Sequence, residues 1–242
     1  HLKKILYLTE ELPFDKNKNG STLMNHFILK GLSQKYDVTI ISYYSDIELD
    51  NITSKFRINR SDIYLFEKTS NFEFLKKFFA VCLFKSPFTF LRNSKLYRKF
   101  NSFILSGKFD HIIIDSHSME IYGRRYPNII NLSLHDSLSL LYKTIYKSQS
   151  SLQRFISLYF SFLYMRVEKS LIIRYRKVFF VSKDDPEYLF NNKIPSNVVV
   201  IPNGVEFNSP KVSDKIPNSI VFSGVLDYLP NVDACVNFCK NI

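Results

Sequence analysis

Seven short apolar runs follow one another along the chain with helical stretches between most of them, and this succession constrains the fold most. The runs do not alternate apolar and polar residues, which is typical of parallel strands covered on both faces. Strands that alternate with helices predict a doubly wound α/β domain, Rossmann-like, with a mainly parallel sheet and helices on both faces. The runs lie at residues 5–8, 37–44, 62–67, 110–117, 128–137, 176–182 and 197–204.

The last of these runs ends in a sharp turn at Pro202-Asn203-Gly204. Proline fixes φ, and asparagine and glycine tolerate positive φ, so the turn is tight. The charge changes at the same place: residues 1–200 carry 30 Lys and Arg against 18 Asp and Glu, whereas residues 201–242 carry 3 against 4. The turn therefore predicts a domain boundary.

The stretch beyond the turn reads as a linker and then one β-α unit. The run "SIVFSGV" at residues 219–225 predicts a strand, and a helix is expected to start at Pro230. We therefore divide the chain into a domain at residues 1–204 and the start of a second domain at residues 205–242.

The net charge of +11 favours an anionic partner: phosphates, nucleic acid or an anionic membrane surface. The chain has no nucleic-acid recognition motif, so no nucleic-acid partner is expected. Residues 71–100 hold seven Lys and Arg, one acid and nine Phe and Tyr. Such a segment lies on an anionic bilayer surface or forms amphipathic helices packed on the sheet, and both interpretations stay open.

Motifs for cofactors and metals are absent from the sequence. It contains neither GxGxxG nor GxxxxGK[ST], and no HExxH and no CxxC pair, so we expect no cofactor and no metal. The three cysteines form no obvious disulfide framework, which favours a reducing cytoplasm. The longest apolar-rich run, residues 155–165, is too short to cross a bilayer of ~30 Å.

Four pieces of the sequence resemble the GT-B glycosyltransferases, glycosyltransferase family 4 in particular. They are the loop that ends at Gly20 before a helix, "LHDSLSLLY", "VFFVSKDD…NVVVIPNGVEF" and "IVFSGVLDYLPNVDA". The last two, in this order and spacing, are the specific part. Within family 4 the chain looks most like enzymes that build bacterial capsule, exopolysaccharide or lipopolysaccharide. The resemblance covers the chain nearly end to end, but only about the first two thirds of a full family member.

This resemblance implies transfer of a sugar from a nucleotide-sugar donor to a glycan or lipid-linked acceptor, with retention of the anomeric configuration and without a metal or cofactor. Residues 1–204 would hold the acceptor, and the domain that begins at residue 205 would hold the donor. Two glutamates seven residues apart, which hold the donor in the family, do not occur here. The chain is therefore expected to be an acceptor-domain fragment, weak or inactive by itself. It would be cytoplasmic, peripheral on the inner face of the membrane.

The resemblance also implies site residues. His117 would line the catalytic cleft, and Asp136 would act as a base or orient the acceptor hydroxyl. Both stand at the carboxyl ends of neighbouring strand runs, so both would point into one cleft. Asp115 would only cap or orient. Substrate contacts are expected, by the resemblance, at Gly20, Ser21, Ser137, Asn203, Gly204 and Gly224. Ser137 has a second interpretation, as the cap of the helix that follows, and Asn19-Gly20 departs from the family's two adjacent glycines.

Two other functions stay open. One is a non-catalytic module that binds a membrane or a glycan. The other is a sugar-nucleotide epimerase of the same GT-B fold, which would release a free sugar without using an acceptor.

Overall fold

The computed structural model describes residues 2–12, 20–43, 53, 56–68, 93–145, 151–204, 217–224, 226 and 229–241. The chain divides into two compact units, His1–Asn203 and Gly204–Ile242. The division falls inside the Pro202-Asn203-Gly204 turn. That the second unit begins a donor-binding domain stays a prediction.

The first unit is built on one seven-stranded sheet in the order β3-β2-β1-β4-β5-β6-β7. Every strand pair is parallel, as expected from the continuous apolar runs. In the register, Leu6 of the first strand lies between Thr39 and Ile112 on its two neighbours. The strands are β1 Lys4–Leu8, β2 Asp37–Tyr43, β3 Ile63–Phe66, β4 His111–Asp115, β5 Ile130–His135, β6 Lys177–Phe180 and β7 Val198–Val200.

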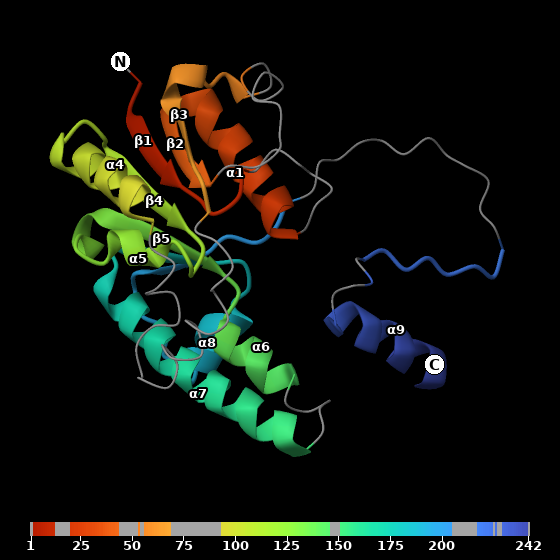
Figure 1. Cartoon of the computed structure of the whole chain (residues 1–242). Helices are drawn as coiled ribbons and strands as arrows, with labels where there is room; N and C mark the ends of the chain where they lie inside the picture. Colours follow the sequence, from red (N-terminus) through yellow and green to blue (C-terminus); the bar gives the residue numbers. More distant parts are fainter. Residues whose placement is uncertain are drawn as a thin grey trace. The chain divides into compact units, whose positions relative to one another are not determined.

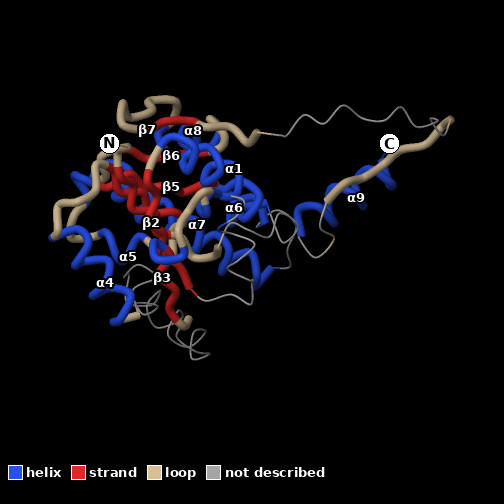
Figure 2. Tube along the Cα trace, turned by 90° about the horizontal axis from the view of Figure 1, so that it is seen from above, coloured by secondary structure: helices blue, strands red, loops and turns tan. Residues whose placement is uncertain are grey.

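Helices connect these strands and flank the sheet (Figures 1 and 2). One of them shows why it begins where it does: the Asn93 side chain accepts hydrogen bonds from the backbone N–H groups of Lys95 and Leu96, a helix cap. The helices of this unit are α1 Gly20–Lys35, η1 Arg60–Asp62, α4 Ser94–Leu105, α5 Glu120–Gly123, η3 Pro127–Ile129, α6 Leu138–Ile145, α7 Ser151–Arg174 and α8 Asp184–Phe190.

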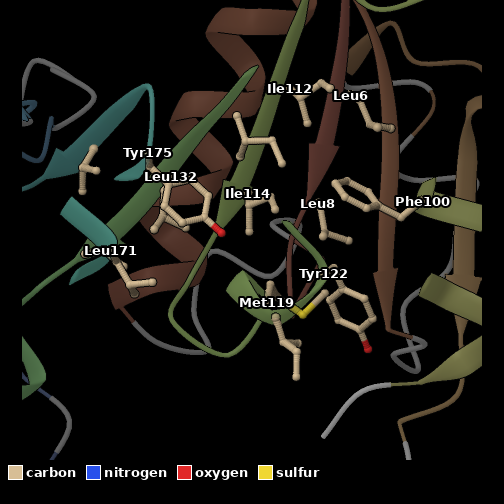
Figure 3. Close-up of a cluster of buried hydrophobic side chains, with 14 of the residues drawn as sticks. Leu6, Leu8, Phe100, Ile112, Ile114, Met119, Tyr122, Leu132, Leu171 and Tyr175 are labelled. Atoms are coloured by element: carbon tan, nitrogen blue, oxygen red, sulfur yellow. The ribbon is translucent and has the colours of Figure 1, made fainter. Parts of the chain in front are cut away.

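Alternate residues of the strands build two hydrophobic cores, one on each face of the sheet. Leu6 and Leu8 face a core that includes Phe100 of α4, Tyr122 of α5 and Ile172 of α7 (Figure 3). The other core takes the opposite residues of the same strands and packs against α1. It consists of Ile5, Tyr7, Leu12, Leu29, Val38, Ile40, Phe56 and Ile58. The predicted doubly wound α/β fold is confirmed.

Helix α5 approaches the sheet closely at Gly123. A Cβ atom there would lie 2.5 Å from Ile114 Cδ1 and 3.0 Å from Ile130 Cδ1. We expect Gly123→Ala to lower the free energy of unfolding by about 1–3 kcal/mol, because the packed core must shift to admit a methyl group. Urea unfolding followed by circular dichroism measures the change.

Gly31 in α1 is the matched control for that substitution. A Cβ atom at Gly31 would meet nothing within 4 Å, so Gly31→Ala should stabilise the helix by up to about 1 kcal/mol. Equal effects of the two substitutions would show that the close approach of α5 does not constrain the core.

The second unit contains the predicted helix but not the predicted strand within its described residues. Its helix, α9 Leu229–Asn241, starts within one residue of Pro230. The predicted strand covered residues 219–225; its described residues, 219–224, form no strand, and Ile220, Val221 and Phe222 are exposed. A strand requires hydrogen bonds to a neighbouring strand. The expected strand is therefore wrong for this chain.

The described residues test only part of what the sequence predicts about membranes. Within the described residues, no helix combines the length and the apolar character that crossing a bilayer requires. Of the basic and aromatic segment 71–100, only residues 93–100 are described, and residues 94–100 belong to α4. The remainder of that segment lies outside the described residues, so its two interpretations are untested.

Candidate functional site

Polar side chains converge where β4 and β5 end. Asp115 is the last residue of β4, and His135 is the last residue of β5, its direct neighbour in the sheet. His135 has a φ of 59°, and Ser116, which follows Asp115, has a φ of 84°. Positive φ is uncommon for residues other than glycine and gathers at functional sites. The carboxyl ends of these two strands are therefore the candidate site.

Asp115 ties three segments together from a buried position. Its Oδ1 lies 2.6 Å from His135 Nε2, and its Oδ2 accepts hydrogen bonds from Asn25 Nδ2 at 2.6 Å and Thr9 Oγ1 at 3.2 Å. Asn25 belongs to α1, and Thr9 follows β1. The carboxylate thus holds α1, β1 and β5 at one point of the strand-end edge.

His135 forms an ion pair with Asp115 whenever its imidazole is protonated. Burial lowers the pKa of His135, but the charge of Asp115 and its hydrogen bond act the other way, and the net pKa lies above 6.5. The pair therefore stabilises the fold fully below pH 6.5, and this contribution is lost as the pH rises through the folded-state pKa. A cationic imidazole held here offers a counter-charge for an anionic group.

Two buried polar atoms belong to residues in the same region. The hydroxyl of Tyr7 and the Oδ1 of Asn25 have no hydrogen-bond partner within the part of the chain that the structure describes. Burial and the charge of Asp115 both raise the pKa of the Tyr7 hydroxyl, so that group stays neutral. Unpaired buried polar groups are costly and often mark functional sites.

A second network surrounds Glu168, a fully buried residue of α7. Glu168 Oε1 lies 3.0 Å from His117 Nε2 and accepts a hydrogen bond from the backbone N–H of Leu138 at 2.7 Å. Glu168 Oε2 accepts hydrogen bonds from the hydroxyls of Ser137 at 2.9 Å and Ser139 at 2.6 Å. One carboxylate therefore fixes both strand-end loops and the start of α6.

Asp185, in α8, joins the same loop from another side. Its Oδ1 accepts a hydrogen bond from the backbone N–H of Ser137 at 2.9 Å. The net pKa of Asp185 is raised to about 6, with burial as the largest cause. The Ser137 hydrogen bond acts in the opposite direction, and the nearby carboxylates of Asp136, Glu168 and Asp184 add to the increase. Because the folded-state pKa is raised, this group makes the fold less stable as the pH rises from about 4 to about 6.

The rim of the site carries a third group. Lys68 Nζ lies 2.8 Å from Glu10 Oε1, and the Ser118 hydroxyl donates to Glu10 Oε2. Ser118 is also 2.9 Å from the Ser116 hydroxyl. These half-buried or exposed groups link the loops that follow β1, β3 and β4.

The two residues that the resemblance implies as catalytic differ in exposure. Asp136 is exposed just beyond the end of β5. His117 is 8% exposed, and its imidazole is committed to Glu168. Substituting His117 will therefore disturb packing as well as any chemistry.

The remaining residues predicted to contact a substrate lie partly in the first unit and partly in the second. Gly20 and Ser21 open α1, as expected for a loop that ends at Gly20. Ser137 is buried and binds Glu168, and its hydroxyl accepts a hydrogen bond from the backbone N–H of Leu140, so its role as a helix cap is realised. Asn203 ends the first unit, whereas Gly204 and Gly224 belong to the second. Their contacts with a substrate stay predictions.

The sequence predicted only a capping or orienting role for Asp115 and assigned no role to His135, Asn25 or Glu168. Asp115 and His135 stand at the ends of apolar runs, which is a usable signal. Asn25 and Glu168 lie within helical stretches and carry no local signal. Among the described residues, no three or more His, Cys, Asp or Glu side chains gather in a way that could hold a metal ion.

No protein-family model matches the chain. No curated protein sequence matches it either. Solved structures similar to it include a UDP-glucosyltransferase from Polygonum tinctorium in complex with 3,4-dichloroaniline, at 10% identity and a TM-score of 0.44 over 90% of this chain and 56% of that one. UGT2 from Phytolacca americana, complexed with UDP-2-fluoroglucose and pterostilbene, has 9% identity and a TM-score of 0.41 over 86% and 55% of the two chains.

The N-terminal domain of trehalose-6-phosphate phosphatase from Candida albicans is also similar, at 14% identity and a TM-score of 0.37 over 78% of this chain and 42% of that one. The chain thus spans about half the length of these structures. Likenesses at these identities and TM-scores decide nothing about activity.

Proposed function

We propose that the chain is the acceptor-side part of a retaining glycosyltransferase of family 4 that takes a nucleotide-sugar donor. The observation that carries the proposal is the gathering of Asp115, His117, His135 and Asp136 at the carboxyl ends of two adjacent strands of a parallel sheet. In doubly wound sheets this edge is where ligands bind. The four quoted motifs support the same function from the sequence.

The groups at this edge suit transfer between a sugar phosphate and a hydroxyl. Asp136, exposed at the end of β5, would accept a hydrogen bond from the acceptor hydroxyl and orient it. The His135 imidazolium, held by Asp115, would face the negative charge that develops on the leaving phosphate. His117, held by Glu168, would fix the loop that follows β4, and its other ring nitrogen would hydrogen-bond a sugar hydroxyl.

The acceptor is proposed to be a glycan or a lipid-linked sugar diphosphate, in the synthesis of a bacterial surface polysaccharide at the membrane. The basic character of residues 1–200 supports this, because such acceptors carry phosphates on an anionic surface. Residues 205–242 are proposed to begin the donor-binding domain.

The first test is calorimetry of the 242-residue chain with UDP-, GDP- and CMP-sugars. We expect weak binding or none, because the two glutamates that hold the donor in the family are absent from this sequence. Micromolar affinity for any of these donors would contradict the division into acceptor and donor sides.

The second test is sugar transfer by the protein expressed from its native gene. Radiolabelled sugar should pass from one of these donors to a lipid extract of the host membrane, and the product should keep the anomeric configuration of the donor. Release of a free sugar without any acceptor would instead favour the epimerase.

A further inference from the structure

Helix α7 has its polarity reversed over its first half. In this half its inward side buries Ser157 and Ser161, whereas the second half buries mainly apolar residues: Leu163, Tyr164, Leu171 and Ile172. Its outward side exposes Phe155, at 73%, and Phe162, at 55%. A helix on the surface of a water-soluble domain normally presents the opposite arrangement.

The exposed apolar residues form one continuous stripe. Phe155, Leu158, Tyr159 and Phe162 are spaced at i, i+3, i+4 and i+7, so they share one face of the helix. Ile173, 71% exposed, lies on the same face of the helix, two turns beyond Arg166 and one turn beyond Lys169. Apolar side chains in such a stripe are a marker of an interaction surface.

Arginines border this stripe at its C-terminal end. The Arg166 guanidinium lies 5.8 Å from the ring centre of Phe162, one turn earlier on the helix. A cavity of about 260 Å³ opens beside it between α5 and α7, and its lining includes Arg124, Arg166 and Arg174. This cavity faces α5 and α7 and is formed by none of the strand-end residues described above.

One buried carboxylate offsets part of this charge. Glu120 accepts a hydrogen bond from Arg124 Nε at 2.8 Å, lies 3.6 Å from Arg174 Nη2 and accepts another from the Tyr175 hydroxyl at 3.0 Å. These contacts hold two of the arginines in place. Three guanidinium groups against one carboxylate still leave the cavity positive, which suits a phosphate oxygen.

We propose that the outer face of α7 docks the protein on an anionic lipid bilayer. The stripe of Phe155, Leu158, Tyr159 and Phe162 enters the boundary between headgroups and acyl chains, and the arginine cavity binds a lipid phosphate. The pairing of an apolar face with adjoining positive charge selects an anionic bilayer over an apolar or acidic protein surface. This inference deepens the proposed function by naming the surface that would bring the strand-end site to a membrane-bound acceptor.

Vesicle sedimentation tests the proposal without any sugar transfer. The chain should bind vesicles of phosphatidylcholine mixed with phosphatidylglycerol, bind pure phosphatidylcholine less, and release as salt rises. Replacing Phe155 and Phe162 together by serine should weaken binding at least ~10-fold, because two large apolar side chains no longer enter the bilayer. Arg166→Gln, which leaves the Glu120 contacts intact, should weaken binding to the anionic vesicles by roughly 5-fold.

Matched controls lie outside α7 and outside residues 71–100. Leu105 is 70% exposed and Arg57 is exposed, so Leu105→Ser and Arg57→Gln remove the same kinds of group from other surfaces and should change binding little. Circular dichroism verifies that each variant is folded. Failure of the unchanged chain to bind, or equal losses from Arg57→Gln and Arg166→Gln, would overturn the assignment to α7.

Analytical ultracentrifugation tests whether the stripe is instead a contact between copies of the chain. If the chain self-associates, ignores vesicles, and becomes monomeric when Phe155 and Phe162 are replaced, the stripe is a protein contact and the proposal is wrong. Vesicle binding without sugar transfer by the native gene product would leave this surface in place and count against the proposed function alone.

Discussion

Replacing Glu168 by alanine is expected to destabilise the first unit by about 3–5 kcal/mol, a large share of the ~5–15 kcal/mol that stabilises a typical domain. The substitution removes the acceptor of the Ser137 and Ser139 hydroxyls and of the Leu138 N–H. It also leaves the buried His117 imidazole without its carboxylate. Buried donors that lose their acceptor keep their desolvation cost, so the losses accumulate.

Urea unfolding of the variant and of the unchanged chain measures this loss. Glu168→Gln keeps the shape but can accept with one oxygen only, so its loss should be intermediate. Glu67→Ala, at an exposed glutamate after β3, is the matched control and should change the free energy of unfolding by less than about 0.5 kcal/mol. If Glu168→Ala cost no more than the control, the network would not hold the strand-end loops.

The sheet was predictable because its signal is local and repeated. Each apolar run between residues 5 and 204 contains or overlaps a strand, since a strand buried on both faces must be apolar throughout. The run at residues 219–225 has the same composition and forms no strand within 217–224. Composition supplies the apolar side chains, but the neighbouring strand has to come from elsewhere in the chain.

The candidate site was predictable only in part. Strand ends can be read from the sequence, so it was predictable that Asp115, His117, His135 and Asp136 lie at or just beyond the ends of two strands. Burial at that edge depends on helices from distant parts of the sequence. His117 is buried because Glu168, 51 residues away, packs against it, and Asp115 meets Asn25 across 90 residues.

The largest expected effect on activity is at Asp136. Asp136→Asn should lower turnover by ~10²-fold or more if the carboxylate orients the acceptor hydroxyl or takes its proton. In a retaining reaction the hydroxyl attacks from the face that the leaving phosphate occupies, so the phosphate itself can take the proton and Asp136 need only position the nucleophile. Because Asp136 is exposed, the free energy of unfolding should stay within about 0.5 kcal/mol of the unchanged protein.

The assay is transfer of radiolabelled sugar to a membrane extract by the protein expressed from its native gene, with urea unfolding run beside it. Asp37→Asn removes another exposed carboxylate, at the amino end of β2 on the opposite edge of the sheet, and should leave turnover unchanged. His117→Ala should lower turnover and stability together, because its imidazole binds Glu168, whereas Asp136→Asn should lower turnover alone. Near-normal turnover in a folded Asp136→Asn protein would contradict this role and would favour the buried pair of Asp115 and His135 as the reacting groups. The positive φ of His135, a feature common at functional sites, supports that alternative.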